Sequence, residues 1–234
     1  MLSFCRIRLL FSLVILASLA SGLAQAEGGL SIQGTRIVYP QGAKQVSVSL
    51  MNSSTTDSFL VQSWVEDATG KKSPDFIVTP PLYLSGPKNE NIVRVMYAGG
   101  DLPTDHESLY YFIEKAIPSL DKSKIGNGNV LLIAAANRIK LFIRPKGLLQ
   151  DVNSAANTLR FDRVGNKLQI TNSSPYYLTL TDIIYNHQEI NSFMIAPKSQ
   201  LMQTLPVGSD KTITYHYIND FGGTSDSIKK NILP

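Results

Sequence analysis

The chain has 234 residues, of which 43% are hydrophobic and 17% are charged, and its formal net charge is +4. This composition is typical of a globular protein with enough apolar side chains for one or two cores, and it argues against a disordered chain. The near balance of charges gives no electrostatic argument for nucleic-acid binding. No apolar run is long enough for a comfortable transmembrane helix, so we predict no membrane insertion.

The N-terminus has the pattern of a secretory signal peptide. Arg6 and Arg8 precede an apolar run at 9–19, and the Ala-Gln-Ala tripeptide at 24–26 fits a small-x-small cleavage site. Cleavage after this tripeptide removes Cys5, the single cysteine, and leaves 20 basic and 18 acidic residues, a net charge of +2. We therefore predict an exported protein without an internal disulfide or a thiolate metal site.

From residue 27 onward the sequence is typical of an all-β protein. Residues 46–50 alternate between apolar and polar side chains, and residues 59–65 are rich in aromatic and β-branched types. Turn residues such as glycine, asparagine and serine separate these segments. The short, regularly spaced strands favour an immunoglobulin-like sandwich. The predicted strands of this first region are 46–50, 59–65, 76–79, 91–97, 108–117 and 130–143.

A second all-β region follows the Pro-Lys-Gly sequence at 145–147. It has the same texture of short strands and turn residues, and it predicts a second β-sandwich. We place the signal peptide at 1–26, the first domain at 27–145 and the second at 146–234. The predicted strands of the second domain are 161–164, 167–171, 176–184, 192–195, 200–205 and 212–218.

The most unusual segment is the run of seven apolar residues from Val130 to Ala136. In a strand, successive side chains point to opposite faces, so both faces of this segment would be apolar. An antiparallel surface sheet needs only one apolar face, so the second must be covered by the chain itself or by a partner. The three alanines at 134–136 also fit a helix, but the β-rich segment 139–143 favours a strand.

The sequence contains no motif that indicates catalysis or cofactor binding. There is no G-x-S-x-G elbow, no H-E-x-x-H motif and no P-loop. His106, His187 and His216 are far apart in the chain, and no spacing singles out a pair of carboxylates. We therefore predict no enzymatic activity, no cofactor and no metal site.

A set of short motifs runs through both regions in a fixed order. The motifs are TRIVYP at 35–40, QSWVE at 62–66, KSPDFIVTPP at 72–81, LPTDHESLYY at 102–111, KAIP at 115–118, RIKLFIRP at 138–145, NSSPYY at 172–177 and YINDFGG at 217–223. In order and spacing they closely resemble the periplasmic pilus (fimbrial) chaperones of the chaperone–usher pathway.

This resemblance implies both a fold and a function. It implies two immunoglobulin-like domains arranged as an L with a cleft between them. Members of this family bind nascent pilus subunits in the periplasm, complete the subunit's fold with a donor strand, and deliver it to an outer-membrane usher without using nucleotide. The short loop at 119–129 resembles that of chaperones for rod-like pili.

The resemblance also assigns the apolar run to the donor strand. Leu131, Ile133 and Ala135 would fill the open groove of the subunit while the other face of the strand lies on its own sandwich. Burial of one leucine or isoleucine contributes about 1.5–3 kcal/mol. Without the resemblance, the same residues could equally be internal core.

Arg36 and Lys140 match a pair of basic residues that anchors the C-terminal carboxylate of the subunit in this family. Charge-assisted hydrogen bonds to a carboxylate are short and strong, so the chemistry suits an anchor. Strict alternation would direct Lys140 to the face opposite the donor residues. A bulge or a strong twist near Asn137 would redirect it.

Three further charged residues match a salt-bridge network between the two domains in this family: Glu107, Arg144 and Asp220. Their implied role is structural.

An exposed apolar edge is also prone to pairing, so we expect weak self-association of the unliganded protein.

Two other functions remain as alternatives. A structural or adhesive pilus component would need an N-terminal donor extension, and residues 27–33 lack a long alternating apolar run. A secreted enzyme on a sandwich scaffold is possible in principle because fold alone does not decide function.

Overall fold

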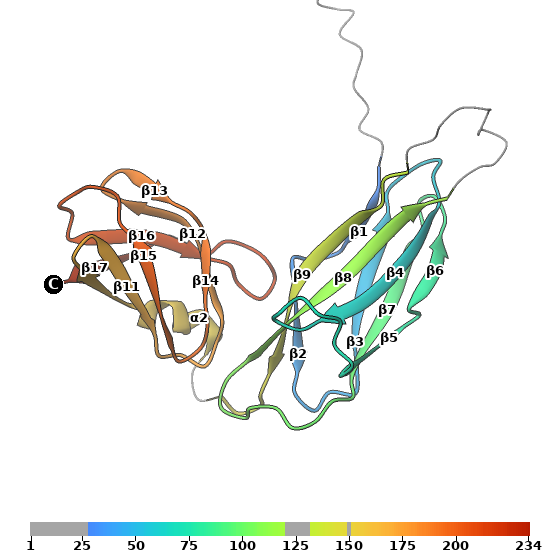
Figure 1. The fold of residues 1–234 in the computed structure, drawn as a ribbon, viewed down its shortest axis with the longest axis horizontal. Coiled ribbons are helices and arrows are strands. Elements are labelled where there is room, and N and C mark those ends of the chain that lie inside the picture. Colours follow the sequence, from blue (N-terminus) through green and yellow to red (C-terminus); the bar gives the residue numbers. More distant parts are fainter. Residues whose placement is uncertain (1–27, 120–131, 149–150) are drawn as a thin grey trace, which may run out of the picture.

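The computed structural model describes residues 28–119, 132–148 and 151–234. The predicted signal peptide, Leu131 and nearly all of the predicted short loop lie outside these residues. Within the described ranges, no helix is long and apolar enough to cross a membrane. The described chain forms two β domains that meet at one end of each (Figure 1).

The first domain is a sandwich of two sheets. Alternating side chains of both sheets face inward, and Leu50, Val93, Phe112 and Leu141 are fully buried between them. One sheet has the order β1 (Leu30–Ile32), β3 (Val46–Asn52), β7 (Glu90–Tyr97), β5 (Phe76–Thr79), and the other has the order β2 (Arg36–Pro40), β9 (Ala135–Arg144), β8 (Ser108–Pro118), β4 (Phe59–Glu66), β6 (Leu82–Ser85).

The predicted strands of this domain are confirmed, with one correction. The strand predicted at 130–143 begins at Ala135, and residues 132–134 belong to no strand. The pairing of β9 with β8 ends at Ala135 opposite Ala116, so residues 132–134 have no ladder partner on β8. The predictions missed the short strands β1 and β6, and they left β2 as a motif rather than a strand.

The second domain is built from eight strands that form one continuous sheet. Its two layers join because one strand, β17, pairs antiparallel with β16 and parallel with β10. Phe161, Ile170, Leu180 and Tyr215 fill the core. The strand order is β13 (Gln188–Ile190), β12 (Leu178–Tyr185), β16 (Thr212–Tyr217), β17 (Ile228–Leu233), β10 (Arg160–Val164), β11 (Lys167–Asn172), β15 (Ser199–Thr204), with β14 (Phe193–Ile195) beside β12.

The six strands predicted here are confirmed to within a few residues, which supports the all-β prediction. The predictions missed β13 and β17. They also missed a single turn of helix, α2 (Val152–Ala155), and the 3₁₀ turn that follows it, η2 (Ala156–Thr158). Ala155 and Ala156 are fully buried, so these turns close one end of the second core.

The two domains contact each other directly where β9 ends. Phe142 points away from the core of the first domain, yet it is only 2% exposed because its ring stacks on Tyr177 of the second domain, with 5.6 Å between the ring centroids. The main-chain N–H of Glu107 donates to the carbonyl of Pro175 at 2.9 Å. These contacts bring the start of β8 and the end of β9 against the residues just before β12.

Candidate functional site

Strand β9 has one edge that is only partly paired. On one side it pairs with β8 along its length from Ala135 to Ile143. On the other side, the parallel pairing with β2 begins at Lys140 opposite Arg36 and continues to Arg144. Residues 135–139 therefore have no strand on this edge within the described chain. In this stretch, Asn137 donates through Nδ2 to the carbonyl of Leu30 at 3.2 Å.

Arg36 and Lys140 lie side by side where this free edge ends, because they are direct partners in the β2–β9 ladder. Arg36 donates through Nη1 to the carbonyl of Ile218 at 3.0 Å, and Lys140 donates through Nζ to Oγ1 of Thr179 at 2.9 Å. Both acceptors belong to the second domain and neither is charged. The two cations therefore occupy the domain junction.

The electrostatic environment of this pair favours an anion. Burial lowers the pKa of Lys140, and the neighbouring Arg36 lowers it further. Burial also lowers the pKa of Arg36, although Asp220 and Glu107 oppose this shift. Arg36 Nε is buried without a hydrogen-bond partner, and neither cation forms an ion pair among the residues that the structure describes. A carboxylate placed here would accept several charge-assisted bonds.

A second charged cluster lies beside this pair at the same junction. Arg144 donates through Nε to Glu107 at 2.7 Å and, in bidentate fashion, to Asp220 at 2.6 and 2.8 Å. The other carboxylate oxygen of Glu107 accepts the main-chain N–H of Tyr177 at 2.9 Å. Glu107 directly precedes β8, Arg144 is the last residue of β9, and Asp220 lies in the loop after β16. The cluster therefore connects the two domains.

Burial has opposite consequences for the two ends of this cluster. Burial raises the pKa of Glu107, and Arg144 opposes the shift. Burial lowers the pKa of Arg144, but its bonds to Asp220 and Glu107 outweigh that effect and the net pKa is raised. Three charge-assisted bonds hold Arg144 in its ionised form.

Of the three predicted donor residues, the structure describes two. Ile133 precedes β9 and its side chain is 71% exposed, and Ala135, the first residue of β9, is also exposed. Leu131 lies outside the described residues. A large apolar side chain thus stands exposed just ahead of the free edge of β9.

The structure shows on which face of β9 Lys140 lies, and it contains no bulge near Asn137. The register of β8 against β9 is unbroken through Asn137. Ala135 lies on the same face as the core residues Leu141 and Ile143, whereas Lys140 lies on the opposite face with Phe142, toward the second domain. Ala135 and Lys140 therefore lie on different faces of β9 without any bulge in the strand.

Sequence reasoning missed two parts of the site. The first is Thr179, the acceptor for Lys140, and the second is the main-chain carbonyl of Ile218, the acceptor for Arg36. Thr179 could have been suspected from the alternation at the start of β12, where it lies between the buried residues Leu178 and Leu180. A carbonyl acceptor has no sequence signal.

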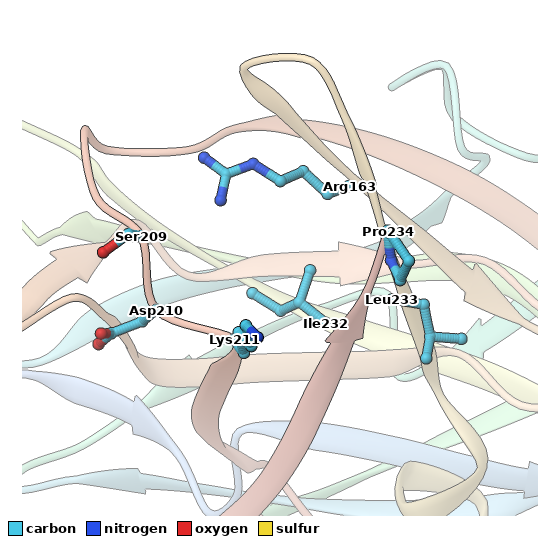
Figure 2. A pocket seen from close by; sticks show the side chains of 7 residues that line it. All are labelled: Arg163, Ser209, Asp210, Lys211, Ile232, Leu233 and Pro234. Carbon is cyan, nitrogen blue, oxygen red and sulfur yellow. The ribbon is translucent and has the colours of Figure 1, made fainter.

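The second domain also has a pocket of about 340 Å³ (Figure 2). None of the residues that line it is among those described above at the domain junction. Arg163, which lines it, donates to the hydroxyl of Tyr185 and to the carbonyl of Gly208, both at 3.1 Å. This arginine therefore braces the fold. Within the described ranges, no group of three or more potential metal ligands comes together.

Comparison with known families matches almost the whole described chain. Residues 29–149 match the pili and flagellar-assembly chaperone family, PapD N-terminal domain. Residues 154–229 match the pili assembly chaperone PapD, C-terminal domain. Both are families of chaperones rather than enzymes, in agreement with the prediction, and they disfavour the alternative of a structural pilus component.

Curated relatives agree along the full length of the chain. The probable fimbrial chaperone SfmC of Escherichia coli K12 is 40% identical over 223 residues, which cover 95% of this chain and 97% of SfmC. The probable fimbrial chaperone LpfB of Escherichia coli O157:H7 is 42% identical over 231 residues, which cover 96% of this chain and 99% of LpfB.

Solved structures share the same fold. The periplasmic chaperone SfaE superposes with a TM-score of 0.74 at 35% identity, covering 88% of this chain and 99% of SfaE. A chain from the complex of the Salmonella enterica SafA pilin with the SafB chaperone has a TM-score of 0.79 at 28% identity, covering 89% of this chain and 98% of that one. The chain therefore belongs to the family of PapD-like pilus-assembly chaperones.

Proposed function

We propose that this protein captures pilus subunits in the periplasm by donor-strand complementation and delivers them to an outer-membrane usher. The observation that carries the proposal is the position of Arg36 and Lys140. They are ladder partners, no carboxylate of the described residues pairs with either of them, and they lie where the free edge of β9 ends. A strand added along this edge would bring its terminal carboxylate to the two cations.

The free edge supplies the main-chain part of this recognition. A subunit strand would pair with residues 135–139 through ladder hydrogen bonds, and the ionic anchor would set its register. Each hydrogen bond from Arg36 or Lys140 to the charged carboxylate contributes about 1.5–3 kcal/mol to binding. Because Arg36 and Lys140 are already held by Ile218 and Thr179, little side-chain entropy is lost when the carboxylate arrives.

The apolar side chains before β9 supply the hydrophobic part. Ile133 and Ala135 would enter the open groove of the subunit, and Leu131 would do so by the same alternation. Since Ala135 shares the face of Leu141 and Ile143, the inserted residues would extend the core of the first domain into the subunit. We further propose that Glu107, Arg144 and Asp220 hold the two domains in a fixed relative orientation for this task.

The test is a tagged pull-down from the native periplasm with the wild-type protein and Lys140→Ala, with partners identified by mass spectrometry. We expect wild type to recover small pilin-like chains and Lys140→Ala to lose them, because the loss of one charge-assisted anchor weakens binding by roughly tenfold to a hundredfold. Circular dichroism establishes that the variant is folded.

A matched control is Lys44→Ala, which removes an exposed lysine of the same domain. It should recover the same partners as wild type. Recovery of pilin-like chains by Lys140→Ala at the wild-type level would reject the anchor. If pilus genes are expressed and neither the wild type nor Lys140→Ala recovers pilin-like chains, the function itself is rejected.

The free edge also suggests how the unliganded protein behaves. An unpaired strand edge beside an exposed Ile133 favours pairing with another chain, so we propose weak self-association in the absence of subunit. Sedimentation velocity over a range of concentrations tests this. A sedimentation coefficient that does not change with concentration would contradict it.

A further inference from the structure

The loop between β16 and β17 presents a fully exposed aromatic side chain. Phe221 is 96% exposed, the largest value among the large hydrophobic residues in the described chain. The loop is a tight turn: Asn219 accepts the main-chain N–H of Gly222 through its carbonyl, and its Oδ1 accepts those of Phe221 and Gly223, each at 3.0 Å. The backbone around Phe221 is therefore well defined.

The same loop is docked onto the first domain on both sides of Phe221. The preceding residue, Asp220, forms the bidentate pair with Arg144. The following residue, Gly222, has φ +84°, and a Cβ added there would lie 2.3 Å from Oγ1 of Thr35. Figure 1 shows the loop extending from the second domain toward β8 and β9. The loop thus has contacts that fix it in place at the domain junction.

Exposure of a single apolar residue is common in soluble proteins and carries no argument by itself. Here the docked backbone keeps Phe221 from withdrawing into the domain. The loop also lies next to the cation site. Gly222 contacts Thr35, the residue before Arg36. Ile218, at the base of the loop, accepts a hydrogen bond from Arg36 through its carbonyl. Phe221 therefore belongs to a loop whose neighbouring residues contact the surroundings of the cation site.

We propose that Phe221 contacts an apolar side chain at the C-terminal end of the bound subunit and so selects subunits whose last residues are apolar. This inference rests on the proposed function, since it takes the terminal carboxylate to be held by Arg36 and Lys140. An exposed aromatic side chain on a loop that borders the two cations suits an extended peptide that ends in a carboxylate and carries an apolar side chain close to it. A polar or acidic terminal residue would leave Phe221 exposed.

The experiment uses fluorescent peptides of alternating valine and serine with a free terminal carboxylate, which end either in phenylalanine or in serine. Fluorescence anisotropy gives the Kd of each peptide for the full-length wild type, for Phe221→Ala and for Val207→Ala. Val207 is the matched control because it is 92% exposed and its carbonyl accepts hydrogen bonds from Asn186 and Gln188, both of the second domain. Lys140→Ala and an amidated phenylalanine-ended peptide test the carboxylate anchor separately.

We expect wild type to bind the phenylalanine-ended peptide about tenfold to a hundredfold more tightly than the serine-ended one, as burial of an aromatic side chain implies. Phe221→Ala should lose this preference and Val207→Ala should keep it. An unchanged preference in Phe221→Ala overturns the inference, even if Lys140→Ala and amidation abolish binding and so support the anchor. Equal binding of amidated and free peptides rejects the anchor and with it the basis of the inference, as does failure of wild type to bind any peptide.

Discussion

Replacing Arg144 by methionine should destabilise the first domain substantially. Methionine keeps much of the aliphatic stem but removes the guanidinium that bonds Glu107 and Asp220. The side chain of Glu107 is 1% exposed and that of Asp220 is 28% exposed, so the main consequence is a buried carboxylate without its cation. Breaking such a pair typically costs about 3–5 kcal/mol.

Two features of the structure reduce this cost. Glu107 keeps its bond from the main-chain N–H of Tyr177, and Asp220 can turn toward water. Protonation of Glu107 limits the penalty further, because a neutral carboxyl tolerates burial. We therefore expect a loss of about 2–4 kcal/mol in the free energy of unfolding at neutral pH.

The single tryptophan, Trp64, belongs to β4 of the first domain and reports the unfolding of that domain in urea. Burial raises the pKa of Glu107, so its contribution to stability is complete below the ordinary glutamate pKa and is lost as the pH rises through the raised value. Removal of Arg144 raises that pKa further. The deficit of Arg144→Met should consequently shrink as the pH is lowered.

Two further variants make the measurement decisive. The double variant Glu107→Gln with Arg144→Met removes the unpaired charge and should recover at least half of the loss. Arg138→Met removes an exposed arginine of the same strand, paired with Glu66, and should cost less than about 1 kcal/mol. A loss of under about 0.5 kcal/mol for Arg144→Met, the range of a surface pair, would refute the reasoning. A double variant as unstable as the single one would do the same.

Two other predictions concern buried polar chemistry and the docked loop. Glu114 is fully buried, and its Oε2 accepts a hydrogen bond from Asn137 while its Oε1 has no partner among the described residues. Burial raises the pKa of Glu114. Glu114→Gln should therefore raise the urea midpoint at neutral pH, because it removes a buried charge. That gain should disappear as the pH falls toward the ordinary glutamate pKa, and a gain independent of pH would contradict the assignment. Gly222→Ala should cost about 1–3 kcal/mol because its φ is +84° and the new Cβ would collide with Thr35. Gly70→Ala, with the same φ and no atom within 4 Å, isolates the backbone part, so equal losses by circular dichroism would show that the contact with Thr35 is unimportant.

The strands that sequence reasoning found are those with a local signal. Segments such as Val46–Asn52 and Thr212–Tyr217 alternate over five or six residues, and the alternation predicts their buried face directly. The strands that it missed include the short edge strands β1, β6 and β13, of three or four residues. Such segments are strands because of the partner that they pair with, and for β1 and β6 that partner lies about 20 residues away in the sequence.

The candidate site divides in the same way. The residue types and their order identified Arg36, Lys140 and the charged trio Glu107, Arg144 and Asp220 through the resemblance to a family. Alternation alone also placed Lys140 on the face opposite the donor residues, and the unbroken register of β9 shows that no bulge is needed.

The sequence by itself determined that the protein is all-β, which side chains share a face of each strand, and where an apolar run needs a cover on its second face. Only the tertiary structure decided that β2 lies parallel to β9 and that their pairing begins with Arg36 opposite Lys140. It also decided that Tyr177 covers Phe142. The physical reason is that side-chain periodicity is a property of the local backbone. Strand neighbours and domain contacts depend instead on hydrogen bonds and packing between segments far apart in the chain.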